Sequence, residues 1–349
     1  MRNKIIFLIT VSLAVPALHA GAGSDGAAFL KIDAGGRAAA MGGAFTAVAD
    51  DASSVFYNPA GPALLRRKEL LLAHNEWLEG LRNEHAAYVQ PVSPRLTLFA
   101  GFTALLAPSL AGYDSAGAET GKFSAMDGAA GAGFAWALKD GDSFFGLFLK
   151  TVYQQADTRK ASAYAGDLGF IKNYGETLRL GAAAQNLGTP IKLYQESFDL
   201  PRTYRGGGAY RVNKRLWVSA EAVKAGASEA MFAAGAEGNL EGAFYARLGY
   251  KTGRARYGGP GFSGGVGIRD GNTGVDYAFT PFGDLGSTHR LTLSFKFGEE
   301  RGEFTPAAPA RRVRRAVKHL PRVKTPKPRP AAVTPPPAET EDKPINFLW

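Results

Sequence analysis

Hydrophobic and polar residues alternate one by one near the C-terminal end of the chain, within residues 275–297. The alternation is unbroken in the last strand-like segment, where one face would hold Leu291, Leu293, Phe295 and Phe297 and the other Thr292, Ser294 and Lys296. A period of two is typical of a β-strand in a sheet with one apolar and one polar face. Soluble sandwiches and membrane barrels both contain such strands, so the rest of the chain decides between them.

Segments of this kind recur from about residue 66 to residue 298, with short turn signals such as 139–142 and 271–274 between many of them. Most alternate clearly, whereas two are partly apolar on both faces (125–139 and 143–155). We expect about fourteen strands, at residues 68–78, 82–92, 95–106, 125–139, 143–155, 161–172, 175–187, 202–212, 215–225, 228–239, 242–252, 260–269, 272–281 and 288–298. The longer connections, 108–122 and 188–201, are expected to be the outward-facing long loops of a barrel.

An export signal precedes these segments. Met1–Lys4 carries two positive charges, Ile5–Val15 is apolar, and Pro16 is followed by small residues up to Ala22. We expect residues 1–22 to be a signal peptide that is cleaved after Ala22 or after Ala20. A membrane anchor is disfavoured because the apolar run is shorter than the about 20 residues that a spanning helix needs. No later run is long enough either, so the mature chain is an exported soluble protein or a barrel.

Composition favours the barrel. The chain has no cysteine, so disulfides do not hold it together, and it has 44 glycines, many of them inside the strand-like segments. Glycine is tolerated in strands where a closed sheet bends or packs tightly against something inside it. The 13 tyrosines and 22 phenylalanines suffice for aromatic girdles. The sequence therefore predicts an all-β fold, a transmembrane antiparallel β-barrel of about 14 strands over residues 66–298, in the lipid of a Gram-negative type outer membrane.

Residues 23–65, ahead of the barrel, are rich in alanine, glycine and small polar residues and do not alternate. Small residues let backbone pack closely against backbone, so we expect this segment to form a plug, or hatch, inside the lumen. Asp50 and Asp51 are expected to cap a helical turn or to pair with a wall arginine such as Arg247 or Arg179. Cation binding by the two acids is the alternative.

A turn with a clear mechanism follows the two acids, at Asn58, Pro59, Ala60 and Gly61. Proline fixes its own φ and keeps the preceding residue out of the α region. We expect these residues to be a fixed corner of the plug, with a role in gating as the alternative.

The composition changes after Phe297. Residues 299–349 hold half of the chain's prolines and a basic cluster at Arg311, Arg312, Arg314, Arg315 and Lys318. Such a segment buries too little apolar surface to fold and is expected to be disordered. The last strand should end on the periplasmic side, so we expect the tail there, in contact with anionic groups or a partner protein, or acting as a spacer. The net charge of +10 is partly a property of this tail, so no nucleic-acid partner is expected.

No catalytic, metal or cofactor site is expected, and the chain is not expected to be an enzyme. His74, His85 and His289 fall inside expected strands without the spacing of metal ligands. The paired glycines at 35–36 and 42–43 lack the βαβ setting of a dinucleotide loop.

The segment FLKIDAGGRAAAMGGAFTAVADDASSVFYNPAGPALL, residues 29–65, resembles the N-terminal signature of the PorV/PorQ family, a branch of the FadL-like outer-membrane proteins. The resemblance continues in RLGAAAQNLG at 179–188 and in the closing hairpin at 276–297, and it covers about residues 27–298. It implies a fourteen-stranded barrel with an N-terminal hatch, whose Asn-Pro-Ala motif corresponds to Asn58, Pro59 and Ala60.

The resemblance also implies a function. PorV-like proteins are associated with the type IX secretion system, in which a barrel receives exported cargo with a C-terminal signal domain and passes it on for surface attachment. We therefore expect secreted cargo proteins and other secretion components as partners. The alternative is FadL-like passive transport of hydrophobic small molecules such as long-chain fatty acids, with a hydrophobic ligand as partner. A purely structural outer-membrane role is a third alternative.

Overall fold

The computed structural model describes residues 25–193, 195–253 and 259–302, all of which belong to the unit Met1–Pro306. The expected signal peptide at 1–22 and the basic cluster at 311–318 lie outside the described residues. Both remain predictions.

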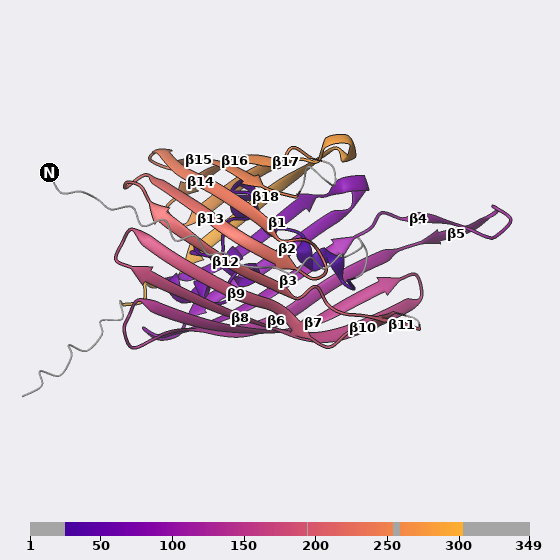
Figure 1. The fold of residues 1–349 in the computed structure, drawn as a ribbon, viewed down its shortest axis with the longest axis horizontal. Coiled ribbons are helices and arrows are strands. Elements are labelled where there is room, and N and C mark those ends of the chain that lie inside the picture. The colour runs from indigo at the N-terminus through magenta and orange to yellow at the C-terminus, as the bar shows by residue number, and fades with distance from the viewer. Residues whose placement is uncertain (1–24, 194, 254–258, 303–349) are drawn as a thin grey trace, which may run out of the picture. The chain divides into compact units, whose positions relative to one another are not determined.

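Fourteen antiparallel strands within the described residues close into a barrel, as the sequence predicted (Figure 1). Each strand pairs with its neighbour along the wall, and β1 pairs with β18 to close the ring. The strands are β1 (Lys68–Glu76), β2 (Arg82–Pro91), β3 (Leu96–Leu106), β6 (Ala125–Ala137), β7 (Ser143–Ala156), β8 (Arg159–Tyr174), β9 (Leu178–Gly188), β12 (Thr203–Arg211), β13 (Leu216–Ala225), β14 (Met231–Glu241), β15 (Phe244–Lys251), β16 (Phe262–Asp270), β17 (Thr273–Pro281) and β18 (Ser287–Phe297).

The two ends of the barrel differ. One end, here called the tight-turn end, holds short turns such as 92–95 and 271–272, together with the start of β1 and the end of β18. The other, the long-loop end, holds the two connections that were expected to be long loops. Each of these contains a short hairpin that the weak alternation of its sequence did not predict, β4 (Leu110–Tyr113) with β5 (Glu119–Phe123) and β10 (Ile191–Leu193) with β11 (Glu196–Phe198). The β4–β5 hairpin projects from the barrel (Figure 1).

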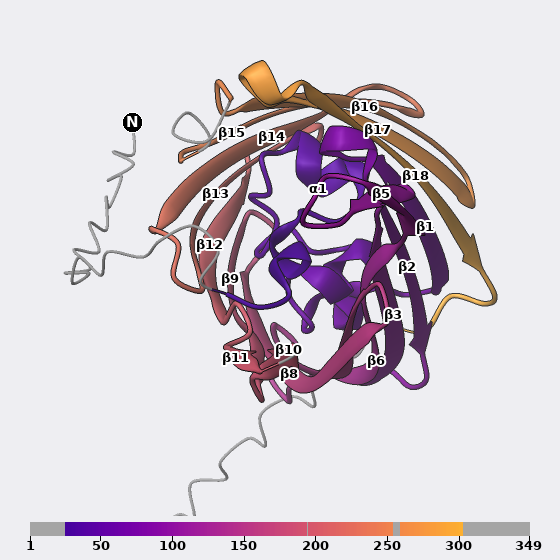
Figure 2. The same ribbon diagram turned by 90° about the vertical axis from the view of Figure 1, so that its right-hand side faces the viewer.

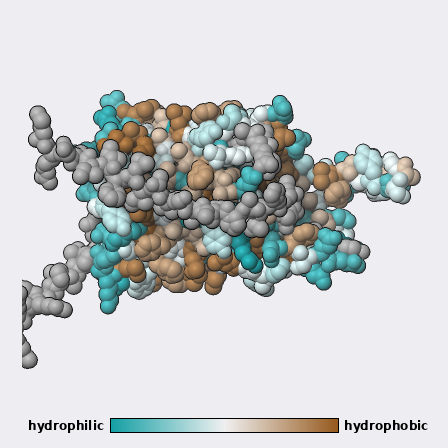
Figure 3. Space-filling view, viewed as in Figure 1, coloured by the Kyte–Doolittle hydropathy of each residue, from teal (hydrophilic) through white to brown (hydrophobic). Residues whose placement is uncertain are grey.

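The outer face of the wall is apolar and the inner face is polar. In β18, Leu291 and Phe295 are exposed, whereas Arg290 and Thr292 on either side of Leu291 are buried. The same alternation runs around the barrel, and Figure 3 shows apolar side chains over the middle of one face with hydrophilic residues toward both ends. An exposed apolar belt of this size on a closed antiparallel sheet is the outer surface of a transmembrane β-barrel. Among the described residues, no helix has the length and apolarity that a membrane span requires.

Residues 25–65 run inside the ring of strands, where Figure 2 shows them in indigo. Their regular structure is short, with α1 (Gly36–Ala40) and three 3₁₀ turns, η1 (Ala28–Lys31), η2 (Ala52–Phe56) and η3 (Gly61–Leu64). Nearly all of these residues are buried, and they form an apolar cluster with inward side chains of the wall. Two further 3₁₀ turns lie in loops of the long-loop end, η4 (Leu78–Gly80) and η6 (Gly283–Leu285).

Glycines in the wall let this segment approach the strands directly. Gly146 on β7 faces the carbonyl of Pro59, and Gly169 on β8 faces the side chain of Asn58. A Cβ atom at either glycine would overlap the segment, and at Gly146 the obstructing atoms are backbone. The expectation that glycine occurs in strands where something packs tightly inside the wall is confirmed at these two positions.

We predict that Gly146→Val lowers the stability of the barrel by about 1–3 kcal/mol, because overpacking against fixed backbone forces the segment or the strand to move. The measurement is the temperature at which purified protein in detergent loses its heat-modifiable gel migration. Gly206→Val is the control, since Gly206 on β12 has open space where a Cβ atom would lie. Equal effects of the two substitutions would contradict the close approach at Gly146.

Candidate functional site

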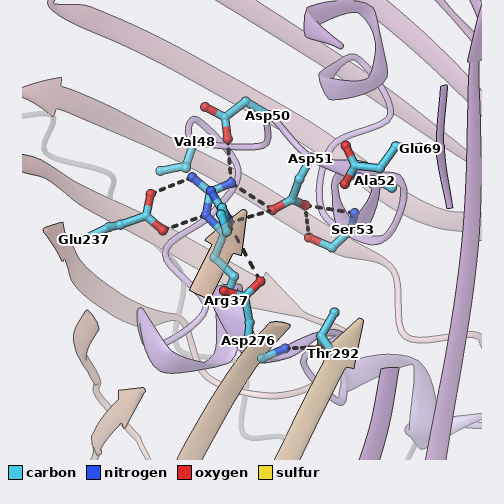
Figure 4. Close-up of polar contacts among 12 residues, drawn as sticks. Arg37, Val48, Asp50, Asp51, Ala52, Ser53, Glu69, Glu237, Asp276 and Thr292 are labelled. Atoms are coloured by element: carbon cyan, nitrogen blue, oxygen red, sulfur yellow. Dashed lines mark hydrogen bonds and ion pairs between the residues drawn. The ribbon is translucent and has the colours of Figure 1, made fainter. Parts of the chain in front are cut away.

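The lumen contains a network of buried charges centred on Arg37 of α1 (Figure 4). The Arg37 guanidinium donates two hydrogen bonds of 2.7 Å to the two carboxylate oxygens of Glu237 on β14. Its Nη1 donates to Asp50 at 2.6 Å and to Asp51 at 2.8 Å. A planar guanidinium suits such bidentate contacts, so Arg37 fixes α1 both to the wall and to the turn that follows it.

The network continues along the wall. Arg247 on β15 donates to Glu237 at 2.6 Å and lies 2.8 Å from Asp276 on β17. Arg269 on β16 lies 3.8 Å from Asp276 and 4.0 Å from Asp51. The Arg37 and Arg247 side chains are almost completely buried, so their charges must be balanced within the protein.

Asp51 caps the 3₁₀ turn η2, because its side chain accepts hydrogen bonds from the Ser53 backbone amide and hydroxyl. Capping of a helical turn was one of the two structural roles expected for the two acids. The main charged partner of Asp51, however, is Arg37 of the segment itself, and Asp50 pairs with Arg37 and lies 3.5 Å from Arg179. Arg247, one of the expected partners of the two acids, instead contacts Glu237 and Asp276 of the wall. Although burial favours the neutral acid, the charges of Arg37 and Arg269 and the bond from Ser53 keep the pKa of Asp51 below its ordinary value.

Asn58 holds the corner that was expected at residues 58–61. Its side-chain amide donates to the carbonyl of Thr46 at 2.9 Å and to that of Phe170 on β8 at 3.1 Å. Its side-chain oxygen accepts from the Ala60 amide, and its backbone oxygen accepts from the Gly61 amide. Asn58 therefore joins two parts of the segment to the wall, which is the geometry of a fixed corner. A role of these residues in gating stays a prediction.

A largely apolar cavity of about 380 Å³ opens between the segment and the wall at the long-loop end, and we call it the vestibule. Trp77 and Phe282 form one side, with their rings 5.2 Å apart and edge to face. Charged groups also border it, including Lys251, which donates to Asp33 at 3.0 Å. The complete lining is Ala28, Phe29, Lys31, Ile32, Asp33, Trp77, Leu105, Met231, Lys251, Phe282 and Arg290.

A second, smaller cavity of about 50 Å³ lies deeper in the lumen, and Phe29 and Ile32 border both it and the vestibule. Its far side is the wall at β7, β8 and β9, where Lys150 donates to Asp167 at 2.7 Å. Segment residues within 29–34 and 55–56 line its other side. The inner cavity therefore lies between the segment and the wall.

The wall beside this inner cavity contains a β-bulge. The pairing of β8 with β9 shifts by one residue between Gly166 and Leu168, and Asn186 adopts a positive φ of 60°. The backbone amide of Asn186 donates to the Asp167 carboxylate at 2.7 Å. Asp167 therefore links its ion pair with Lys150 to the bulge. On the outer face at the same place lies a groove of about 570 Å³, and Lys150 borders both this groove and the inner cavity.

Sequence reasoning missed the residues that organise this site. Arg37, Glu237 and Lys150 were not singled out, although an arginine within the small-residue run GGRAAAMGG is an available signal. No group of three or more His, Asp or Glu side chains among the described residues is arranged to hold a metal ion.

Comparison with known sequences gives a partial match. The model of the Uncharacterised protein family (UPF0164) matches residues 19–95. A UPF0164 protein of Treponema pallidum (strain Nichols) is 29% identical over 215 residues, which are 52% of this chain and 49% of that protein. The chain therefore spans about half the length of the curated relative that it matches.

Comparison with solved structures gives a match in fold over most of the chain. The toluene transporter TbuX of Ralstonia pickettii is similar with a TM-score of 0.56 at 15% identity, covering 76% of this chain and 98% of that one. A FadL homologue of Pseudomonas aeruginosa is similar with a TM-score of 0.52 at 12% identity, covering 74% and 97%. The chain has the fold of a FadL-like barrel, and its closer placement in the PorV/PorQ branch remains a prediction.

We predict that Arg37→Met lowers the free energy of unfolding by about 3 kcal/mol, because it leaves buried carboxylates without their main countercharge. The measurement is the urea midpoint of the refolded protein in detergent. Arg202→Met is the control, since Arg202 forms an exposed pair with Asp199 at 3.7 Å, and it should cost less than about 1 kcal/mol. A loss at Arg37 no larger than that at Arg202 would contradict the network's role.

The lowered pKa of Asp51 predicts how acid affects the segment. Since the folded state holds the ionised carboxylate more strongly, its contribution to stability is complete above about pH 4 and is lost as the pH falls through the folded-state pKa. Asp51→Asn should therefore be less stable than the native protein at pH 7, and this difference should shrink at pH 3. The measurement is the unfolding midpoint of both proteins at the two pH values; a difference that grows on acidification would refute the assignment.

Proposed function

We propose that this barrel allows the passive passage of hydrophobic small molecules across the outer membrane. The observation that carries the proposal is the vestibule, an apolar cavity of about 380 Å³ at the long-loop end, within the size range of small-molecule sites. The similarity in fold to a toluene transporter and to a FadL homologue supports it.

In this proposal residues 25–65 act as the hatch. They are buried inside the ring, and side chains of the wall hold them through buried hydrogen bonds, as with Glu237 and Arg37. A molecule entering the vestibule meets residues 28–33 of this segment first. The segment therefore controls access to the inner cavity.

We further propose that molecules leave through the wall at the β8–β9 bulge. The inner cavity and the outer groove lie on the two sides of this seam, with Lys150 bordering both. A bulge leaves part of the ladder unpaired, so opening the seam there breaks fewer hydrogen bonds than opening it elsewhere. An exit into the apolar part of the membrane suits a hydrophobic molecule better than an exit into water.

The secretion function implied by the resemblance to PorV/PorQ proteins stays a prediction. The projecting β4–β5 hairpin offers an exposed surface, but no feature of it identifies a cargo protein. The apolar vestibule favours passage of small molecules over this alternative.

We predict that a bacterium lacking its own FadL-type channel takes up radiolabelled toluene or oleate several-fold faster when it produces this barrel. Closing the seam with a disulfide between Gly166→Cys and Leu187→Cys should abolish the gain, and a reductant should restore it. These two residues are directly paired beside the bulge, and the chain has no cysteine of its own to interfere.

A cysteine pair at Ala220→Cys and Ala234→Cys is the matched control, since these residues are paired across β13 and β14, away from the bulge. Uptake that is insensitive to the β8–β9 disulfide would contradict the exit route, and no gain for either compound would contradict the proposed function. Retention of cargo with C-terminal signal domains in cells that lack the protein would instead support secretion.

A further inference from the structure

A group of polar side chains lies buried on the inner wall next to the vestibule. Asn75 on β1 and Asn83 and His85 on β2 all face inward, with 1%, 0% and 5% of their surfaces exposed. Asn75 and Asn83 are directly opposed in the pairing of β1 with β2, and His85 is two residues further along β2 on the same face. Cross-strand neighbours of this kind are close enough to act on one bound group.

The register places this group between the two cavities: His85 lines the inner cavity, and the two asparagines lie beside residues that line the vestibule. Leu105 on β3 is opposite Asn83, and Arg290 on β18 is opposite Asn75; both of these neighbours line the vestibule. His85 lines the inner cavity, where its ring lies 5.3 Å from the ring of Phe56. A molecule passing from the vestibule to the inner cavity would therefore move past this part of the wall.

The polar atoms of the group have no hydrogen-bond partner among the residues that the structure describes. Within the described residues, neither the oxygen nor the nitrogen of the Asn75 and Asn83 amides makes a hydrogen bond, and neither do the two ring nitrogens of His85. Buried polar groups are almost always hydrogen-bonded, so such a concentration in one place calls for a cause.

We propose that Asn75, Asn83 and His85 form a subsite for the hydroxyl group of an otherwise apolar molecule, which makes alcohols the preferred substrates of this channel. The inference rests on the proposed function. A hydroxyl both donates and accepts, so it matches amides that offer both roles. A hydrocarbon satisfies none of these atoms. A carboxylate only accepts hydrogen bonds, so it leaves the side-chain oxygens of the two asparagines without a donor.

The experiment compares three compounds that share a phenyl ring and differ in the attached group: 2-phenylethanol, ethylbenzene and phenylacetate. Binding to the full chain in lipid nanodiscs is measured by equilibrium dialysis, with empty nanodiscs as the reference. For the native protein, 2-phenylethanol should bind more tightly than phenylacetate. The double variant Asn75→Leu with Asn83→Leu should bind 2-phenylethanol about tenfold more weakly and ethylbenzene at least as tightly as before.

Since the side-chain amides of the two asparagines make no hydrogen bonds within the described residues, the double variant is expected to fold. His85→Phe is a second, independent test, because it should weaken binding of the alcohol and leave binding of ethylbenzene unchanged. Asn173→Leu is the matched control, because Asn173 on β8 accepts a hydrogen bond from Arg179 and lies toward the tight-turn end. If the variants weaken both compounds equally or neither, the subsite is refuted. If the native protein binds none of the three compounds above the empty nanodiscs, the proposed function itself fails.

Discussion

In a bilayer every backbone amide and carbonyl group needs a partner within the protein, and the closure of this sheet follows from that constraint. The closing seam joins β1 to β18 over nine residue pairs, from Lys68 with Phe297 to Glu76 with His289. Once the ring is closed, the alternation of apolar and polar residues along each strand determines what faces the lipid and what faces the lumen. The apolar positions meet lipid, and the polar positions face a lumen that has to be filled or hydrated.

The lumen is filled by a segment that carries its own countercharges. Glu237 of the wall meets Arg37 of the segment, and Glu221 on β13 accepts from the backbone amides of Phe45 and Thr46 while Arg205 holds its other oxygen. Burying such ions costs desolvation, which their mutual attraction roughly offsets. Their main effect is therefore on position, since any other placement of the segment would leave buried charges without partners.

The parts of this structure that could be predicted from sequence are those that local periodicity encodes. All fourteen strands were expected within a few residues of their observed bounds, because alternation, turn residues and glycine act over short stretches. The site depends instead on pairs such as Arg37 and Glu237, which are 200 residues apart and have no shared pattern. Similarly, the alternation of side chains along a strand places Asn75 and His85 on the inner face. It does not reveal which of their polar atoms form hydrogen bonds there. The two loop hairpins were missed because their sequences are short and polar.

The segment is held by different groups in its two parts, and this difference bears on the proposed transport. Residues 36–61 are fixed by the Arg37 network, by Glu221 and by Asn58, and wall glycines let their backbone touch the strands. Residues 25–34 are held by other groups. The Gly26 and Ala27 amides donate to Asp199 and Gln154, and Asp25 and Asp33 accept from the Ala227 amide and from Lys251. The vestibule and the inner cavity border this second part, whereas a third cavity of about 30 Å³ borders the Arg37 network at Asp51, Arg269 and Asp276. In the proposed transport, passage through the barrel requires movement of the residues next to the vestibule, while the ion network keeps the remainder of the segment in place.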